Sequence, residues 1–410
     1  MADQQSLSSW FIGLSPEHIT RENVREWLAW AMFGQWYHEL DEDVKRHKGH
    51  VHRSHPLFFV DRTVKLFEAR RGHPYPQKVE LTQAEKVRHR MMLVTLDPVR
   101  VSQRPLSSYL LQMALSIGVR GYLCARFRVR ELRCERIRYL LYEPPDWDIE
   151  EAINGEAPLP VLFLHGLGFG VPQYVFAIRA LLGVPGRARR PVLVPELPWM
   201  SHEFFSPEYL YPWQAPEAAD TIESIVRLHG FERCGISVIS HSMGTITHSF
   251  LIKRCTSMVR RSVLVDPVCF QLWVPEVCYR FLYKRADSFV ELMLRYFVAR
   301  ELGIANTITR HFEWSSNVLL PNELPNANDP QRTRIFLAGS DTVLDAPGVQ
   351  KYLARNGIVD TVTYVPGEHH GGTIMVPNRH LDDMVSWLDE GLSMEGDAIA
   401  SLKSSSTEAA

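Results

Sequence analysis

Short apolar runs alternate with longer amphipathic segments over the second half of the chain. Apolar runs bounded by glycine or proline occupy residues 161–166, 190–198, 236–242, 261–268, 334–341 and 361–367. Segments with helical spacing lie at 215–230, 244–255, 347–357 and 378–392. The runs predict buried strands and the longer segments predict helices. This alternation predicts an α/β fold, with a mainly parallel sheet covered by helices on both faces.

The first 150 residues predict a mostly helical N-terminal extension. Residues 20–34 give its clearest helix: Thr20 suits the N-cap, Val24, Trp27 and Leu28 follow helical spacing, and Gly34 suits the end. Residues 61–143 also read as mostly helical. A change of composition near residue 150 marks the start of the α/β domain, predicted at 151–395.

Two further segments stand out within this plan. An aromatic-rich stretch with helical spacing interrupts the strand pattern and predicts a helical cap insertion at residues 269–325. The small, polar residues 396–410 predict a disordered tail.

The apolar segment at residues 107–127 is followed by an arginine-rich run at 126–138. An apolar helix face bordered by arginines suits a membrane surface, whereas a helix packed on the main domain with its arginines in water is the alternative. Arg120 lies near the centre of the segment, and no stretch is long and apolar enough to span a bilayer. Peripheral membrane association is therefore a prediction to be tested.

Composition narrows the classes of partner and compartment. The chain has 410 residues and a formal net charge of −2, so it lacks the basic field that gathers nucleic acid. Its 6 cysteines form no C-x-x-C pair, and the N-terminus carries no basic and apolar secretion signal. We expect reduced thiols and a cytoplasmic location. The histidine-rich residues 47–55 read as a basic loop, and no metal site is predicted.

The sequence "VISHSMGT" places Ser242 between a predicted strand and a predicted helix. A nucleophile elbow requires this placement, because a tight turn then exposes the hydroxyl above the sheet at a helix N-terminus. The residues on either side must be small where strand and helix pass closely. Gly244 meets this requirement, and Ser240 stands where glycine is more usual. An ordinary N-cap serine is the alternative interpretation.

A second motif, "LFLHGLGFG", places His165 and Gly166 directly after an earlier strand. A tetrahedral intermediate of acyl transfer needs two main-chain N–H donors. One such donor follows the nucleophile, here Met243, and the other comes from a loop after an earlier strand, here Leu167. The motif therefore predicts an oxyanion hole, with a glycine-rich turn of no chemical role as the alternative.

An acid and a histidine base should follow the serine along the chain. Asp341 lies just past a strand in "LAGSDTVLDAP", with Asp345 and Asp266 as rival acids. The loop "GEHHGG" offers His370, which we prefer, and His369 as its rival.

Together these motifs resemble the α/β-hydrolase family, specifically its serine hydrolases, over residues 159–394. The resemblance implies Ser242 as nucleophile, His370 as base, Asp341 as acid, and Leu167 with Met243 as oxyanion donors, with His165, Gly166 and Gly244 in support and no cofactor. It implies hydrolysis of a carboxylic ester with an apolar or lipid-like acyl group through an acyl-enzyme. The alternative is a non-catalytic interaction protein that retains the fold.

Overall fold

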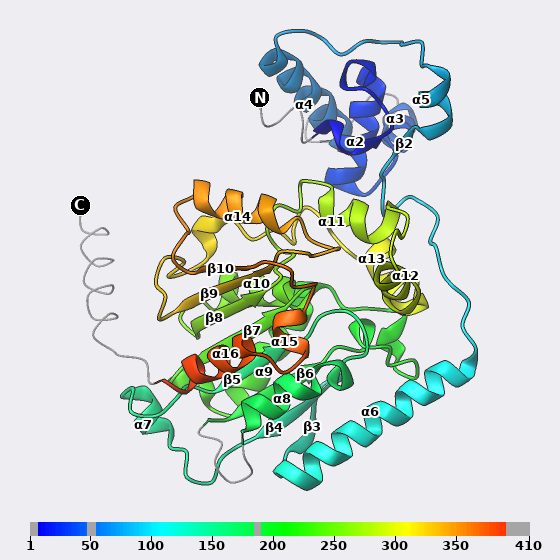
Figure 1. Cartoon of the computed structure of the whole chain (residues 1–410). Helices are drawn as coiled ribbons and strands as arrows, with labels where there is room; N and C mark the ends of the chain where they lie inside the picture. Colours follow the sequence, from blue (N-terminus) through cyan, green and yellow to red (C-terminus); the bar gives the residue numbers. More distant parts are fainter. Residues whose placement is uncertain (1–6, 47–54, 184–189, 391–410) are drawn as a thin grey trace, which may run out of the picture. The chain divides into compact units, whose positions relative to one another are not determined.

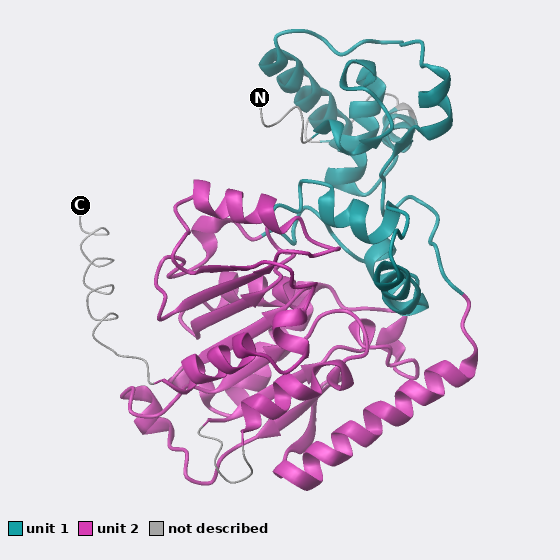
Figure 2. Cartoon of the chain, viewed as in Figure 1, with its two compact units in different colours: residues 1–102, 271–318 teal, residues 103–270, 319–410 magenta. Residues whose placement is uncertain are grey.

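The computed structural model describes residues 7–46, 55–183 and 190–390, which fall into two compact units (Figures 1 and 2). Unit 1 comprises residues 1–102 and 271–318, and unit 2 comprises residues 103–270 and 319–410. The boundary after the N-terminal extension thus lies near residue 102, whereas the sequence suggested 150. The insertion that joins unit 1 lies within the predicted range 269–325. The predicted tail at 396–410 is outside the described residues.

Unit 1 is mainly helical and is built from two separate parts of the chain. Its elements are β1 (Phe11–Ile12), α2 (Arg21–Phe33), α3 (Tyr37–Arg46), α4 (Pro56–Arg71), α5 (Gln83–Arg88), β2 (Arg90–Met91), α11 (Glu276–Cys278), α12 (Phe289–Leu294) and α13 (Leu302–Arg310). The predicted caps of α2 are confirmed: the Thr20 side chain accepts from the N–H of Asn23, and Gly34 ends the helix in the left-handed conformation.

Unit 2 contains an eight-stranded sheet in the order β10-β9-β8-β7-β5-β6-β4-β3. The strands are β3 (Arg130–Cys134), β4 (Ile137–Tyr142), β5 (Val161–Leu164), β6 (Val192–Glu196), β7 (Ile236–His241), β8 (Val259–Val265), β9 (Thr333–Ala338) and β10 (Val362–Val365). The pairs β3–β4 and β4–β6 are antiparallel and the other pairs are parallel. The mainly parallel α/β sheet is therefore confirmed.

The helical interpretation of residues 61–143 is wrong for residues 130–142. The arginine-rich run forms all of β3 and the start of β4, and the two strands make a hairpin at the sheet edge. Its side chains alternate between exposed and partly buried in β3, which is a strand period. The hairpin extends the sheet of unit 2, so this part of the chain belongs to the α/β unit.

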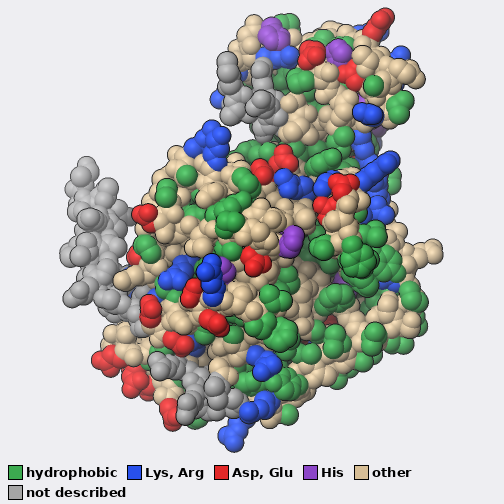
Figure 3. Space-filling model, viewed as in Figure 1, with side chains coloured by type: hydrophobic (Ala, Val, Ile, Leu, Met, Phe, Trp, Pro, Cys, Tyr) green, Lys and Arg blue, Asp and Glu red, His purple; other side chains and the backbone are tan. Residues whose placement is uncertain are grey.

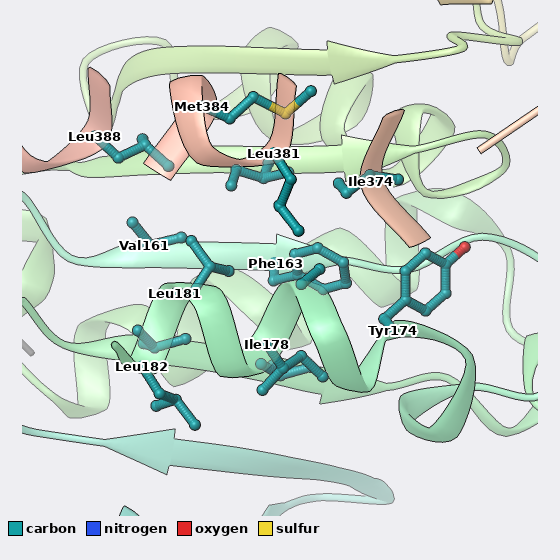
Figure 4. Close-up of a cluster of buried hydrophobic side chains, with 14 of the residues drawn as sticks. Val161, Phe163, Tyr174, Ile178, Leu181, Leu182, Ile374, Leu381, Met384 and Leu388 are labelled. Carbon is teal, nitrogen blue, oxygen red and sulfur yellow. The ribbon is translucent and has the colours of Figure 1, made fainter. Parts of the chain in front are cut away.

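Helices cover both faces of the sheet. They are α6 (Leu106–Phe127), α7 (Ile149–Ile153), α8 (Val175–Leu182), α9 (Ala215–Leu228), α10 (Gly244–Arg254), α14 (Ala346–Arg355), α15 (Gly372–Met375) and α16 (Arg379–Asp389). On one face, Val161 and Phe163 of β5 pack with Leu181 of α8 and Leu381 of α16 (Figure 4). Helix α10 contacts β5, β7 and β8 and also packs against α9. In the described part of the chain, no helix combines the length and apolar character needed to cross a bilayer.

Candidate active site

Ser242 occupies a sharp turn between β7 and α10. Its φ of 51° lies in the left-handed region, which non-glycine residues adopt rarely and mostly at strained functional positions. A Cβ on Gly244 would lie 2.4 Å from the Leu164 carbonyl oxygen, so only glycine fits where α10 crosses β5. This is the geometry expected of a nucleophile elbow.

Ser240 does not loosen the turn, because its hydroxyl has partners inside the protein. The Ser240 Oγ lies 2.8 Å from His248 Nδ1 and 3.4 Å from the Val263 carbonyl oxygen. On its other side, the His248 ring lies 3.2 Å from the Ser262 hydroxyl. Burial lowers the pKa of His248 to about 3, so the ring is neutral and links α10 to β7 and β8. The protein therefore accommodates a serine where glycine is more usual, because the buried hydroxyl has hydrogen-bond partners.

The three residues proposed from the sequence are brought together at the carboxyl ends of the strands. His370 Nε2 lies 2.8 Å from Ser242 Oγ, and His370 Nδ1 lies 2.6 Å from Asp341 Oδ2. The other carboxylate oxygen of Asp341 accepts the N–H groups of Val343 and Leu344 at 2.7 and 2.8 Å. The acid is thus held in one orientation against the imidazole.

The rival residues occupy other positions. Because Ser242 and Asp341 engage both ring nitrogens of His370, Asp345 is not the orienting acid; it directly precedes α14. His369 is exposed, and its Nδ1 lies 3.2 Å from the Ser340 carbonyl oxygen. Asp266 is buried, and its carboxylate accepts the N–H groups of Ala338 and Gly371 at 2.8 and 2.7 Å. It therefore braces the loop that carries His370.

Several N–H groups of the loop after β5 already have hydrogen-bond acceptors. The N–H of Gly166 donates to the Tyr174 hydroxyl at 2.9 Å, that of Gly168 to the Met200 carbonyl at 3.0 Å, and that of Phe169 to Gln173 Oε1 at 2.9 Å. The N–H of Leu167 makes no hydrogen bond to another described residue, and neither does that of Met243. These are the two residues that the sequence predicted as oxyanion donors.

His165 fixes the base of the same loop. Its Nδ1 lies 2.9 Å from the Gly166 carbonyl oxygen, and its Nε2 accepts the N–H of Leu197 at 3.1 Å. Burial lowers the pKa of His165, so the ring is held neutral with its proton on Nδ1. A Cβ on Gly166 would lie 3.0 Å from Ser242 Cβ and from the Tyr174 hydroxyl, which explains the glycine.

Sequence reasoning missed two residues of the site, Tyr174 and His241. The Tyr174 hydroxyl lies 2.7 Å from His241 Nδ1 while it accepts the Gly166 N–H. The rings of His241 and His370 have centroids 5.0 Å apart. Burial, and then the neighbouring His370 and His165, hold the pKa of His241 well below its usual value. A signal for His241 existed in its position beside Ser242, but Tyr174 had none, because its hydroxyl reaches the site only through the fold.

Charges around His370 favour its protonated form. Burial alone would lower the pKa of His370, but the Asp341 carboxylate, its hydrogen bond and the Asp266 charge outweigh burial and raise the pKa to about 9. Burial raises the pKa of Asp266 to about 6, against the effect of His370. The site therefore stabilises an imidazolium, the state that a base reaches after it takes a proton.

One group of side chains also has metal-ligand character. The ligand atoms of His241, Asp266 and His370 lie within 4.8 Å of one another. A metal ion here would have to displace Ser242 or Asp341 from His370, since both nitrogens of that ring are engaged. The arrangement fits proton transfer better than metal ligation.

Comparison with known proteins places the chain in a family. The family model described as "Alpha/beta hydrolase family" matches residues 161–386, which is more than half of the chain. No curated protein sequence matches the chain.

Similar solved structures include three hydrolases of low identity. A membrane phospholipase A described as a bacterial virulence factor is 14% identical, with 69% of this chain and 94% of that chain covered and a TM-score of 0.44. The carboxylesterase CesB of Bacillus subtilis is 12% identical (70% and 100% covered, TM-score 0.44). A structure from a study of two fungal esterases of Rhizomucor miehei is 16% identical (71% and 97% covered, TM-score 0.42). The sheet, the elbow and the family match agree, and the chain belongs to the alpha/beta hydrolase family.

Proposed function

We propose that the protein is a serine hydrolase that cleaves a carboxylic ester with an apolar or lipid-like acyl group. One observation carries the proposal: Ser242 Oγ, the His370 ring and the Asp341 carboxylate form a continuous hydrogen-bonded chain, with links of 2.8 and 2.6 Å. A scaffold without chemistry has no physical need for a strained serine at one end of such a chain.

In the proposed reaction, Ser242 Oγ attacks the ester carbonyl carbon while His370 Nε2 takes the hydroxyl proton. The resulting imidazolium is stabilised by Asp341, and the oxyanion binds the N–H groups of Leu167 and Met243. His370 then gives its proton to the leaving alkoxide, which departs as an alcohol. Water, deprotonated by His370, attacks the acyl carbon; the bond to Ser242 Oγ then breaks, His370 returns the proton to Ser242 Oγ, and the carboxylic acid leaves.

Fluorophosphonate labelling tests the nucleophile directly. We expect the unmodified protein to be labelled, and Ser242→Ala to lose the label. Ser224→Ala is a matched control, because Ser224 is an exposed serine of the same unit whose hydroxyl donates to the Asp220 carbonyl. A folded protein whose labelling is absent, or is unchanged in Ser242→Ala, would contradict the proposal.

Turnover of p-nitrophenyl esters of graded acyl length tests the substrate class, with thioester and amide analogues in parallel. We expect activity on esters that increases with acyl length. A folded protein with neither labelling nor turnover would favour the alternative, a non-catalytic interaction protein that retains the fold. Faster cleavage of the thioester or the amide would identify that class of compound, rather than esters, as the substrate.

Peripheral membrane association belongs to this proposal, because a lipid-like ester resides in a bilayer. Its motivation is the apolar segment at residues 107–127 with the arginines that follow it. A cytoplasmic location remains the expectation from the reduced cysteines. All 6 cysteines are free thiols in the structure, which is compatible with that expectation.

A further inference from the structure

Helix α6 packs on the rest of unit 2 with a polar stripe facing inward. Gln112, Ser116 and Arg120, spaced four residues apart, are buried together with Leu123 and Phe127. Gln112 Nε2 donates to the Ser201 carbonyl at 3.3 Å, and Arg120 lies 3.4 Å from Glu196 and 3.3 Å from Glu203. A surface helix of a protein in water normally buries its apolar stripe instead. The large apolar side chains of α6 are therefore left on its outward face.

That outward face is apolar and uncharged. We define the outer face of α6 by its large exposed side chains, namely Leu106, Leu110, Leu111, Met113, Leu115, Ile117 and Tyr122, which are 38–73% exposed. Between Leu106 and Ala125 the only charged residue is Arg120, and it is buried. Figure 3 shows hydrophobic side chains along the edge of unit 2 that α6 forms in this view. A contiguous apolar patch of this kind marks an interaction surface.

The charges at the end of the outer face indicate the kind of partner. Arg126 and Arg128 are exposed at the C-terminal end of α6, and Arg133 is exposed on the adjoining β3. No acidic residue occurs on α6. Apolar side chains with arginines at their border suit the boundary between acyl chains and anionic headgroups. Tyr122, near the basic end, is amphipathic and suits the same depth.

We infer that the outer face of α6 docks on a phospholipid bilayer, with the helix axis in the plane of the interface. The 22-residue helix is about 33 Å long. In this orientation its leucines enter the acyl region, while the arginines at its end reach the headgroups. A bilayer with anionic lipid is the preferred occupant.

The inner face of α6 connects this surface to the candidate site. Gln112 Oε1 lies 2.7 Å from His202 Nδ1, and the rings of Tyr109 and Phe204 have centroids 5.2 Å apart. The centroids of the His202 and Phe169 rings lie 5.3 Å apart, and Phe169 belongs to the loop after β5. Docking would thus order the segment 198–206 against the loop that carries Leu167. This step rests on the proposed function: we expect vesicles to raise turnover of long-chain esters.

Vesicle flotation tests the docking without any need for activity. The probes are vesicles of phosphatidylcholine alone and of phosphatidylcholine with phosphatidylserine. We expect the full chain to float with both, and better with phosphatidylserine. Ser242→Ala should float like the unmodified protein, so failure of the hydrolase proposal and failure of docking give different results.

Two double variants separate the outer face from general effects of charge. Leu111→Glu/Ile117→Glu should bind vesicles on the order of 100-fold more weakly, because two apolar side chains that enter the acyl region of the bilayer are replaced by charged ones. Leu228→Glu/Val359→Glu, at other exposed positions of unit 2, adds the same charge and should bind normally. Arg126→Gln/Arg128→Gln should weaken binding only to anionic vesicles, about five-fold for each arginine.

Three outcomes would overturn the inference. The first is an unmodified chain that stays unbound with both kinds of vesicle. The second is equal loss of binding in the two double glutamate variants. The third is a dimer, measured by analytical ultracentrifugation, that Leu111→Glu/Ile117→Glu dissociates while vesicles bind neither form; a second copy of the chain would then cover this face.

Discussion

Replacing Ser240 by glycine restores the residue more usual at this position of the elbow, and we expect it to destabilise the protein. The substitution removes the hydroxyl that pairs with His248 Nδ1 at 2.8 Å, and both residues are 0% exposed. A buried polar atom left without a partner costs about 1–3 kcal/mol. Glycine inside a strand costs about a further 0.5–1 kcal/mol.

The expected loss is therefore about 1.5–4 kcal/mol for Ser240→Gly and about 1–3 kcal/mol for Ser240→Ala. For a domain of roughly 250 residues, about the size of unit 2, each kcal/mol lowers Tm by about 2 °C. Differential scanning calorimetry measures this shift. Labelling at Ser242 should survive, since the turn itself is made by Ser242 and Gly244.

A double-mutant cycle with His248→Leu isolates the pair. If the hydrogen bond is the cause, Ser240→Ala in the His248→Leu background costs less than in the unmodified protein by about 0.5–3 kcal/mol. Additive effects, or a Tm that rises in Ser240→Gly, would refute the reasoning. The hydrogen bond between Ser240 and His248 would then not stabilise the protein.

Four other predictions concern the site and the buried ion pair of α6. Tyr174→Phe should lower kcat for a p-nitrophenyl ester by roughly 10-fold, because the Gly166 N–H loses its acceptor; an unchanged kcat would contradict this. Since His370 must be neutral to act as base and its pKa is about 9, kcat/KM should rise about tenfold from pH 7 to pH 8 and level off above pH 9. Asp266→Asn removes a charge that raises the pKa of His370, so the rise in kcat/KM should move to lower pH. A kcat/KM profile that is already flat at pH 7 in the unmodified protein would contradict both pH predictions. Arg120→Met should lower the free energy of unfolding by about 3 kcal/mol, because Glu196 stays buried without one of its cations; a Tm within error of the unmodified protein would exclude that.

Sequence patterns were sufficient for β5 to β10 of unit 2 and for the caps of α2, since both depend on local spacing and on the chemistry of single residues, but they missed β3 and β4. The order of Ser242, Asp341 and His370 was also readable, because each follows a strand whose end lies at one edge of the sheet. Their mutual distances required the structure.

The orientation of α6 could not be read from its sequence. Gln112, Ser116 and Arg120 form a polar stripe at helical spacing, and such a stripe ordinarily indicates the face in water. Only the partners provided by distant residues, such as Glu196 and the Ser201 carbonyl, show that the stripe is buried. Tyr174 was invisible for the same reason, because its role depends on two residues that the fold brings to its hydroxyl.

Unit 1 is assembled from two stretches that the ribosome delivers at different times. Cys278 belongs to the same buried cluster as Trp10 and Leu28, and the indole of Trp10 donates to the Trp273 carbonyl. Synthesis of the intervening residues 103–270 takes roughly 10–30 s. During that interval the N-terminal helices lack part of their core, so nascent chains paused in this window should be the ones most prone to chaperone capture and proteolysis.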